Sequence, residues 1–489
     1  MIQKDVIKIS LFYIISTGFI LLNIFFVVKK DLLIINTLPF LLGIVLFVIF
    51  SFDKLIYLIV FFAPLSIPLR GLRPDLSFDM FLPTEPLLFL VLIVFMLKII
   101  HERNFEKSII THPVSLAVFL NLFWILITCF TSTMPVISIK FFLVRVWFVS
   151  ILYFLTVKLL SQKIKAENYI WLYIIPFIIV IFYSIYRHSG YGLWDKQAAH
   201  FVVSPFYNDH TSYGAALAIY LPFVVLFSFS RIYSKRLRLA SRAVLLIFIA
   251  AIILSYSRAA WVSIAGAIFI WTVIKLKLPL KSMIISIIIL FGSITLFQDQ
   301  ILMHLQKNSV ESSSNLVEHV YSISNITSDA SNLERINRWN CAIRMFREKP
   351  FLGFGPGTYM FNYAPYQLNT NRTIISTNAG DLGNAHSEYL SALSESGIPG
   401  LITFLLIIIT VLYTAIYTYK RLNDKRLKSL ILAATTGLAT YYIHGFLNNF
   451  LDTDKLSVPF WGFTAMIVAL DLYSRDKLQN TEKLSGRGI

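Results

Sequence analysis

Long apolar runs recur along almost the whole chain, and they limit the folds open to it more than any other feature. Two examples are PVSLAVFLNLFWILITCFT at 113–131 and GIPGLITFLLIIITVLYTAIYT at 397–418. A run of about 18 or more apolar residues is long enough to cross a bilayer as a helix. Backbone inside lipid must satisfy its own hydrogen bonds, and the alternating pattern of a membrane barrel is absent. We therefore predict an all-α polytopic membrane protein.

The composition agrees with this class. Of the 489 residues, 57% are hydrophobic and 14% are charged, whereas soluble proteins carry about 25% charged residues. About fourteen runs are candidate spans, and because two of them could be short or re-entrant we expect about 12–14 helices. The candidate spans are 8–28, 32–50, 54–69, 85–99, 113–131, 138–157, 168–186, 212–229, 242–256, 259–274, 281–297, 397–418, 429–447 and 456–473.

Basic residues indicate which loops face the cytoplasm. The net charge of +17 would suggest a nucleic-acid partner in a soluble protein, but here the lysines and arginines gather in alternate short loops, where they set topology. We therefore expect no nucleic acid, and we expect both termini to be cytoplasmic. The N-terminal run lacks a small-x-small cleavage site and is predicted to be a retained helix. The basic loops lie at 98–107, 158–165, 231–242, 275–281 and 420–428.

One polar insert interrupts the pattern of spans. Residues 298–396 are expected to form a periplasmic loop, which is too long to be structureless. The predicted organisation is a transmembrane bundle, this loop with its amphipathic helix, C-terminal transmembrane helices and a cytoplasmic tail. These parts are 1–297, 298–396, 397–473 and 474–489.

Within the insert, NLERINRWNCAIRMFREKP has the spacing of an amphipathic helix. Glu334 and Arg338 stand four residues apart and would support it. We expect the helix to lie on the outer membrane surface or to cap the bundle, and a Gly/Pro loop rich in aromatics follows it. The apolar stripe consists of Leu333, Ile336, Trp339, Ile343 and Phe346.

Unusual polar residues converge on the predicted outer ends of the helices. Arg145 lies about two turns inside its span, where a charge costs about 3 kcal/mol unless it meets a polar partner. Arg258, in ILSYSRAAW, separates two spans, and His386 precedes another. His210 and His444 also fall at outer helix ends. This convergence is the main functional signal, because the positive-inside rule disfavours arginine on that side.

Arginines at a membrane–water boundary suit a diphosphate, which a guanidinium group binds with two parallel hydrogen bonds. A polyprenyl-diphosphate sugar fits, since its tail lies in lipid and its diphosphate at the interface. Glycosyl transfer from it needs a base, for which His386 is a candidate, and cations that stabilise the leaving diphosphate. We expect no metal and no cofactor, because the outer loops offer only a weak DxD match, Asp452 and Asp454. Cys129 and Cys341 show no metal-binding spacing.

Several residues have a structural interpretation beside the functional one. Arg335 and Arg338 are either ligands or a solvated helix face. Glu388 and Glu395 could simply favour the positive end of their helix, so they are supporting candidates. Arg70 and Arg73 are treated as ordinary loop charges. A transporter of a lipid-linked glycan or a small anion is the main alternative class, although transporters place ionisable residues near the bilayer midplane. A structural scaffold is a weaker one.

Three motifs together resemble the O-antigen ligase and O-antigen polymerase superfamily of bacterial membrane glycosyltransferases. NRWNCAIRMFREKPFLGFGPGTYMFNY followed by NAHSEYLSALSESGIPGL is similar to its signature region. ILSYSRAAWVS resembles its Ser-Arg-small element, with alanine where glycine is common, and SPFYNDHTSYGAALAIYLPF resembles the segment before it. The resemblance covers about residues 200–450.

The resemblance implies a multi-pass enzyme of the bacterial inner membrane that transfers glycans from undecaprenyl diphosphate without a metal, at the periplasmic face. It implies that His386 is catalytic and that Arg258 binds the diphosphate, with Arg145 as a second such arginine. The acceptor would be a lipid A-core sugar in a ligase, which we favour slightly, or the terminal sugar of another lipid-linked repeat in a polymerase. Membrane lipids are the remaining partners.

Overall fold

The computed structural model describes residues 16–26, 55–72, 75, 79–102, 106–162, 166–276, 330–369, 376 and 383–484. The chain divides into two units, residues 1–56 and 57–489. The first unit contributes one described helix, Ser16–Phe26. The predicted spans 32–50 and 281–297 and the first part of the polar insert lie outside the described residues.

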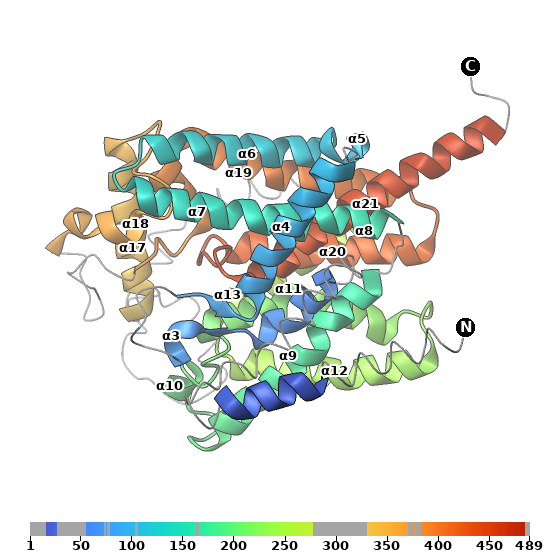
Figure 1. Ribbon diagram of the computed structural model, residues 1–489, viewed down its shortest axis with the longest axis horizontal. Coiled ribbons are helices and arrows are strands. Elements are labelled where there is room, and N and C mark those ends of the chain that lie inside the picture. The colour runs from blue at the N-terminus through green and yellow to red at the C-terminus, as the bar shows by residue number, and fades with distance from the viewer. Residues whose placement is uncertain are drawn as a thin grey trace. The chain divides into compact units, whose positions relative to one another are not determined.

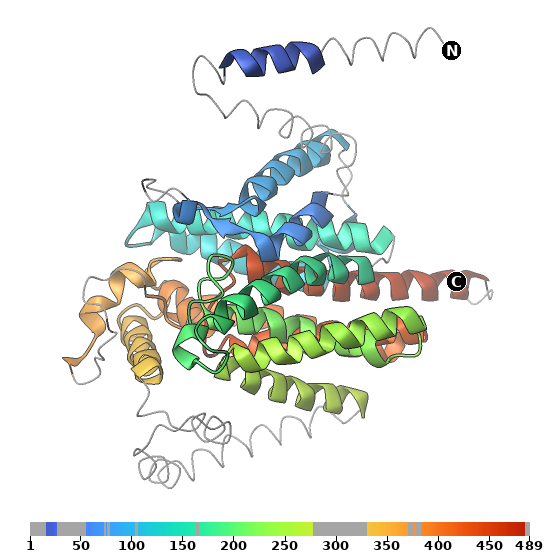
Figure 2. The same cartoon turned by 90° about the horizontal axis from the view of Figure 1, so that it is seen from below.

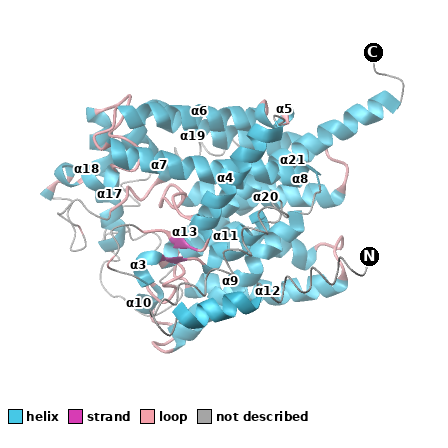
Figure 3. Cartoon of the chain, in the orientation of Figure 1, coloured by secondary structure: helices cyan, strands magenta, loops and turns pink. Residues whose placement is uncertain are grey.

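The second unit is a bundle of long helices with one small sheet (Figures 1 and 3). Nine helices in the described part of the chain are long and apolar enough to cross a membrane, which confirms the all-α polytopic fold. A π-helical turn at Val149–Leu155 joins α7 and α8 into one span. The long helices of the bundle are α4 (Thr84–Glu102), α6 (Pro113–Phe130), α7 (Pro135–Phe148) with α8 (Thr156–Gln162), α9 (Ala166–Ser189), α11 (His210–Phe229), α12 (Lys235–Leu254), α13 (Arg258–Lys275), α19 (Glu388–Arg421), α20 (Lys425–His444) and α21 (Asp454–Leu484).

Short elements connect and cover the long helices. Strands β1 (Ile67–Pro68) and β2 (Phe81–Leu82) pair antiparallel. In both views α17 and α18 lie at one end of the bundle (Figures 1 and 2). The short helices are α3 (Leu69–Leu72), α5 (Lys107–Ile110), α10 (Lys196–Ala199), α17 (Ala330–Glu348) and α18 (Tyr359–Asn362), with 3₁₀ turns at Ala63–Leu65 and Ala364–Tyr366.

Side-chain caps fix where the helices of the predicted site begin. The Ser257 hydroxyl accepts from the amide of Ala260 (3.4 Å), so α13 starts at Arg258. Asp209 accepts from the amides of Thr211 and Ser212 and starts α11 at His210, and Ser387 starts α19 at Glu388. Each such cap contributes about 1 kcal/mol. The polar residues singled out in the sequence thus occupy first helical positions because of the residue before them.

Helices α20 and α21 form the centre of the bundle. α21 is the most deeply buried candidate span, and it packs against α8, α11, α19 and α20. α20 also contacts α11 and α13, and α11 contacts α13. Glycines permit close approach: a Cβ on Gly437 would overlap the carbonyl of Ile219, and one on Gly214 would overlap Ser257. The first turns of α11 and α13 therefore meet beside the last turn of α20.

The insert has a small core of its own, and α17 packs against α19. The predicted ion pair within α17 is present, with Arg338 Nε 2.6 Å from Glu334 Oε1. The inward face of α17 includes Glu334 and Arg338, which are buried as a pair, whereas Ile343 of the apolar stripe is exposed. The expected place of this helix, on the outer membrane surface or capping the bundle, stays a prediction. The insert core contains Cys341, Ala342, Met345, Phe354, Tyr359, Tyr363 and Ala385.

A kink divides α19 at Gly397, whose φ of 69° lies in the left-handed region. A Cβ there would overlap the carbonyl of Phe351, and the next amide, of Ile398, donates to the carbonyl of Pro350 (2.8 Å). The predicted span 397–418 started at this kink. The helix begins nine residues earlier, at Glu388, because Ser387 caps it there.

Candidate functional site

Three histidines lie within electrostatic range of one guanidinium group. The charge of Arg335, on α17, acts on His386, His210 and His444. The charge of Arg258 also acts on His210. These side chains come from the start of α11, the start of α13, the end of α20, α17 and the segment before α19. We call His210, Arg258, Arg335, His386 and His444 the basic cluster.

His386 is held in an unusual backbone conformation. Its φ of 48° lies in the left-handed region, which a residue other than glycine adopts only when its surroundings impose it. Its amide donates to the side-chain oxygen of Asn384 (3.0 Å), and its carbonyl accepts from the indole of Trp339 (3.2 Å). Burial, together with the charges of Arg335 and Arg338, lowers the pKa of His386 to about 4. The imidazole is therefore neutral, as a base must be, at neutral pH.

Arg338 has a different environment from Arg335, although both lie on α17. It is buried, it pairs with Glu334, and its guanidinium carbon is 4.0 Å from the centroid of the Tyr363 ring. A Cβ on Gly383 would overlap the same guanidinium group. Arg338 therefore joins α17 to the segment that carries His386, which makes it a positioning residue.

The start of α11 brings further polar groups to the basic cluster. The rings of His200 and His210 are 4.0 Å apart between centroids. Burial would raise the pKa of Asp209, but hydrogen bonds from the Ser212 amide and the Thr211 hydroxyl outweigh it and lower that pKa. The Nε2 of His444 lies 3.1 Å from the amide nitrogen of Asn448. The cluster thus contains both guanidinium groups and hydrogen-bonding imidazoles.

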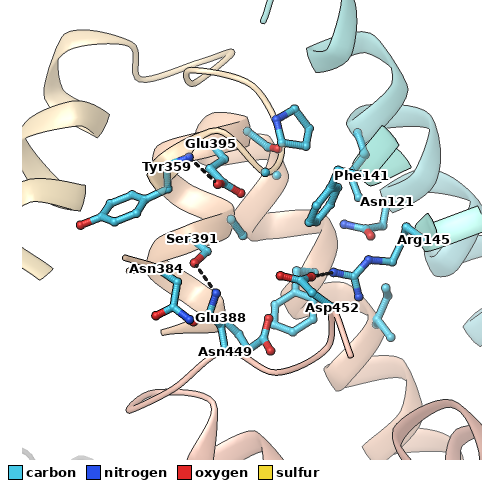
Figure 4. Close-up of a pocket in the computed structure, with 18 of the residues that line it drawn as sticks. Asn121, Phe141, Arg145, Tyr359, Asn384, Glu388, Ser391, Glu395, Asn449 and Asp452 are labelled. Carbon is cyan, nitrogen blue, oxygen red and sulfur yellow. Dashed lines mark hydrogen bonds and ion pairs between the residues drawn. The ribbon is translucent and has the colours of Figure 1, made fainter. Parts of the chain in front are cut away.

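Arg145, Glu388 and Glu395 lie around a separate cavity of about 270 Å³ (Figure 4). Side chains from α6, α7, α19 and the loop before α21 line it, including Asn121 and Phe141. The structure therefore divides the predicted site residues between two neighbouring places.

Arg145 has an acidic partner, and its expected role in binding the diphosphate stays a prediction. Its Nη2 lies 3.2 Å from Asp452 Oδ1, and its Nη1 donates to the carbonyl of Leu451 (3.4 Å). Its guanidinium carbon also lies 5.2 Å from the ring centroid of Phe141. The structure places Arg145 at the cavity, with Asp452, and not among the residues of the basic cluster.

The two glutamates of the opening turns of α19 hold loops. Glu388 Oε1 accepts from the Tyr441 hydroxyl (2.6 Å) and from the amides of Phe450 (2.8 Å) and Leu451 (3.0 Å). Glu395 Oε1 accepts from the amide of Tyr359 (2.8 Å). Both side chains are buried. Their hydrogen bonds fix the loop before α21 and the aromatic loop of the insert, a more specific role than favouring a helix end.

Several residues of this region were not singled out in the sequence: Asn121, Asn384, Asp209 and His200. Asn121 is an amide inside a long apolar run, and Asn384 stands two residues before His386, so both carried a signal that was overlooked. Asp209 and His200 carried none, because their position depends on the fold. Of the two predicted loop arginines, Arg70 is exposed, and residue 73 lies outside the described residues.

The weak DxD match does not behave as a pair. Asp452 contacts Arg145, whereas Asp454 accepts from the hydroxyls of Ser66 and Thr84. In the described part of the chain, no group of three or more His, Cys, Asp or Glu side chains is arranged to hold a metal ion. Cys129 and Cys341 are free and buried.

Comparison with known families identifies one region. Residues 243–405 match the family described as O-antigen ligase. This range contains Arg258, α17, His386 and the kinked start of α19. No curated protein matches the chain.

Proposed function

Because residues 243–405 match the O-antigen ligase family, we propose that the chain transfers a glycan from undecaprenyl diphosphate to a sugar hydroxyl at the periplasmic face of a bacterial inner membrane. The observation that carries the proposal is the basic cluster. His210 and Arg258 open helices α11 and α13, which contact each other, and His444 ends α20, which contacts both. Helix α17, which carries Arg335, is bonded through Trp339 to the carbonyl of His386. The cluster stands at the ends of apolar helices, where a lipid-linked diphosphate would lie.

In this proposal Arg258 and Arg335 bind the diphosphate of the donor. Guanidinium groups donate two parallel hydrogen bonds to phosphate oxygens, and their charge does not depend on pH in the physiological range. As the glycosidic bond breaks, negative charge grows on the bridging oxygen of the leaving diphosphate. Cations that are already in place stabilise that charge without reorganisation. They would perform the task that a metal ion performs in other transferases.

His386 is the proposed general base. Its neutral imidazole would accept the proton of the acceptor hydroxyl while that oxygen attacks the anomeric carbon from the face opposite the diphosphate. One carbon–oxygen bond forms, the bond to the diphosphate breaks, and its electron pair leaves with polyprenyl diphosphate. The anomeric centre is inverted, and the proton on His386 passes to solvent. The lowered pKa keeps the base unprotonated at neutral pH.

The acceptor is proposed to be a lipid A-core sugar, as in a ligase. The same chemistry would serve a repeat-unit polymerase, whose acceptor is the terminal sugar of a second lipid-linked glycan. His386 and the arginines would act identically in both cases.

The test is transfer by the purified protein from a labelled undecaprenyl-diphosphate oligosaccharide, offered with lipid A-core and, separately, without it. Product that persists in EDTA and is lost in His386→Ala supports the proposal. Elongated lipid-linked glycan in the second arm identifies a polymerase. Movement of labelled donor across proteoliposomes without any new glycosidic bond would overturn the proposal in favour of transport.

A further inference from the structure

We propose that the cavity beside Arg145 is the binding site for the acceptor sugar, a proposal that rests on the proposed function. It would hold the sugar ring whose hydroxyl is activated, while the basic cluster holds the diphosphate of the donor. Four observations carry this assignment: the pairing of its one guanidinium group, its hydrogen-bonding groups, its size and the two chain segments that it shares with the basic cluster.

The ionisable groups of the cavity suit a neutral sugar better than a diphosphate, because the one guanidinium group of its lining already has an acidic partner. Three carboxyl groups line it, those of Glu388, Glu395 and Asp452, against one guanidinium group, that of Arg145. Arg145 is already paired with Asp452. A diphosphate would face this excess of carboxyl groups, whereas sugar hydroxyls donate to carboxyl oxygens. The cavity thus offers hydrogen-bonding groups, whereas the basic cluster offers guanidinium groups, as acceptor and donor require.

The remaining polar groups of the cavity are amides and hydroxyls. Asn121, Asn384 and Asn449 line it together with Ser391, Ser396 and Tyr359. The Asn449 amide nitrogen lies 3.4 Å from the Ser391 hydroxyl, and its buried side-chain oxygen has no hydrogen-bond partner among the described residues. A buried acceptor without a partner is costly, and a sugar hydroxyl would satisfy it. Amides provide both donors and acceptors, which matches hydroxyl groups.

Aromatic and apolar surfaces complete the lining, and the volume sets a limit on the ligand. Phe141 and Trp461 offer ring faces or edges to the C–H surface of a sugar. The cavity holds about 270 Å³, the space of about nine waters at roughly 30 Å³ each. This suits one terminal sugar and not a long glycan, so the rest of the acceptor would extend outside.

Two chain segments place the cavity against the basic cluster. In the first, Asn384 and Glu388 line the cavity while His386 belongs to the cluster, and the His386 amide donates to Asn384. In the second, Asn448 contacts His444 while its neighbour Asn449 lines the cavity. The cavity and the basic cluster therefore share two chain segments, residues 384–388 and 448–449, which makes them neighbours along the chain.

The first experiment measures steady-state transfer while donor and acceptor are varied independently, with lipid A-core glycolipid and lipid-linked repeat unit as the two acceptor probes. Asn449→Ala should raise the KM of the acceptor about tenfold, the effect of losing roughly 1.4 kcal/mol of hydrogen bonding, and should leave the KM of the donor unchanged. Ala392→Phe places a large side chain of α19 in the cavity and should raise the KM of the acceptor more than Asn449→Ala does. Asn362→Ala, outside the cavity, is the control.

A second experiment does not depend on transfer. Diazirine-bearing glucoside and N-acetylglucosaminide probes are photolysed with the wild type and with His386→Ala, and labelled peptides are mapped by mass spectrometry. Labelling within 384–396 or 445–452 in both proteins, lost in Ala392→Phe, supports the acceptor site even if transfer fails. Labelling outside these two segments, or labelling that Ala392→Phe does not reduce, would overturn the acceptor site. In the first experiment, an equal rise in the KM of the donor and of the acceptor in Asn449→Ala would also overturn it.

Discussion

The Nε of Arg338 donates a 2.6 Å hydrogen bond to Glu334, one turn earlier on α17, in a face that is turned away from solvent. Glu334→Gln should leave a buried guanidinium group with a neutral partner, and breaking a buried pair costs about 3–5 kcal/mol. We expect a clear fall in the thermal unfolding temperature of the detergent-purified protein. An unchanged unfolding temperature would show that the pair contributes nothing. Arg347→Gln, on the exposed face of the same helix, is the control.

The segment that carries His386 should respond to Gly383→Ala. The added Cβ would overlap the Arg338 guanidinium group, so that either Arg338 or the segment must move. Transfer should fall by about 10²-fold, because a displacement of this size in a catalytic group has that effect. Hydrogen–deuterium exchange over 383–390 should increase. Wild-type exchange together with wild-type activity would argue against the positioning role of Arg338.

The pH dependence of kcat/KM should report the lowered pKa of His386. A general base must be unprotonated, so activity should decline on the acid side with a midpoint near pH 4 instead of near 6.5. The same group affects stability: the unfolded chain binds this proton near pH 6.5 and the folded chain near pH 4. Above pH 6.5 His386 is neutral in both states, and its contribution to the free energy of unfolding is fully present. As the pH falls from 6.5 to 4 the unfolded chain takes up the proton first, so the free energy of unfolding decreases. An acid limb at pH 6.5 would contradict the assignment.

Arg258→Lys should impair transfer severely while leaving the helix intact. Lysine keeps the charge but cannot form two parallel hydrogen bonds with a phosphate oxygen pair, and loss of one such contact in a transition state costs about 10²–10³ in kcat. Lys275→Arg, at the opposite end of α13, serves as a matched control. Rates near those of the wild type in Arg258→Lys would remove Arg258 from the proposed diphosphate site.

Glu395→Ala should loosen the aromatic loop of the insert. The Tyr359 amide would lose its acceptor (2.8 Å in the structure) inside a buried region, at a cost of about 1–3 kcal/mol. Limited proteolysis of the purified protein should then cleave the loop 351–366 faster. Glu395→Gln, which retains a carbonyl oxygen, should restore much of the protection. Equal cleavage of both variants would show that the carboxylate itself is required.

The sequence predicted the helices well and the cavity not at all. Apolar runs and basic loops identify spans because the bilayer imposes length and topology on each helix separately. The sequence suggested a common site for His210, Arg258 and His444 because each falls at a predicted outer helix end. The separation of Arg145 from Arg258 could not be predicted, since it depends on how α7 packs against α21 and α13 against α20. The inward face of α17 was missed for a related reason: pairing of Glu334 with Arg338 made a polar face suitable for burial.

The Gly397 kink has a consequence for engineering. The amides of Phe354 and Gly355 donate to the carbonyls of Ser394 and Glu395, respectively. The amide of Ile398 donates to the carbonyl of Pro350. Main-chain hydrogen bonds therefore connect the aromatic loop of the insert to the first turns of α19. Domain exchange between relatives should therefore place its downstream junction beyond residue 400. A junction at the apparent start of the apolar run would separate two halves of one hydrogen-bonded unit.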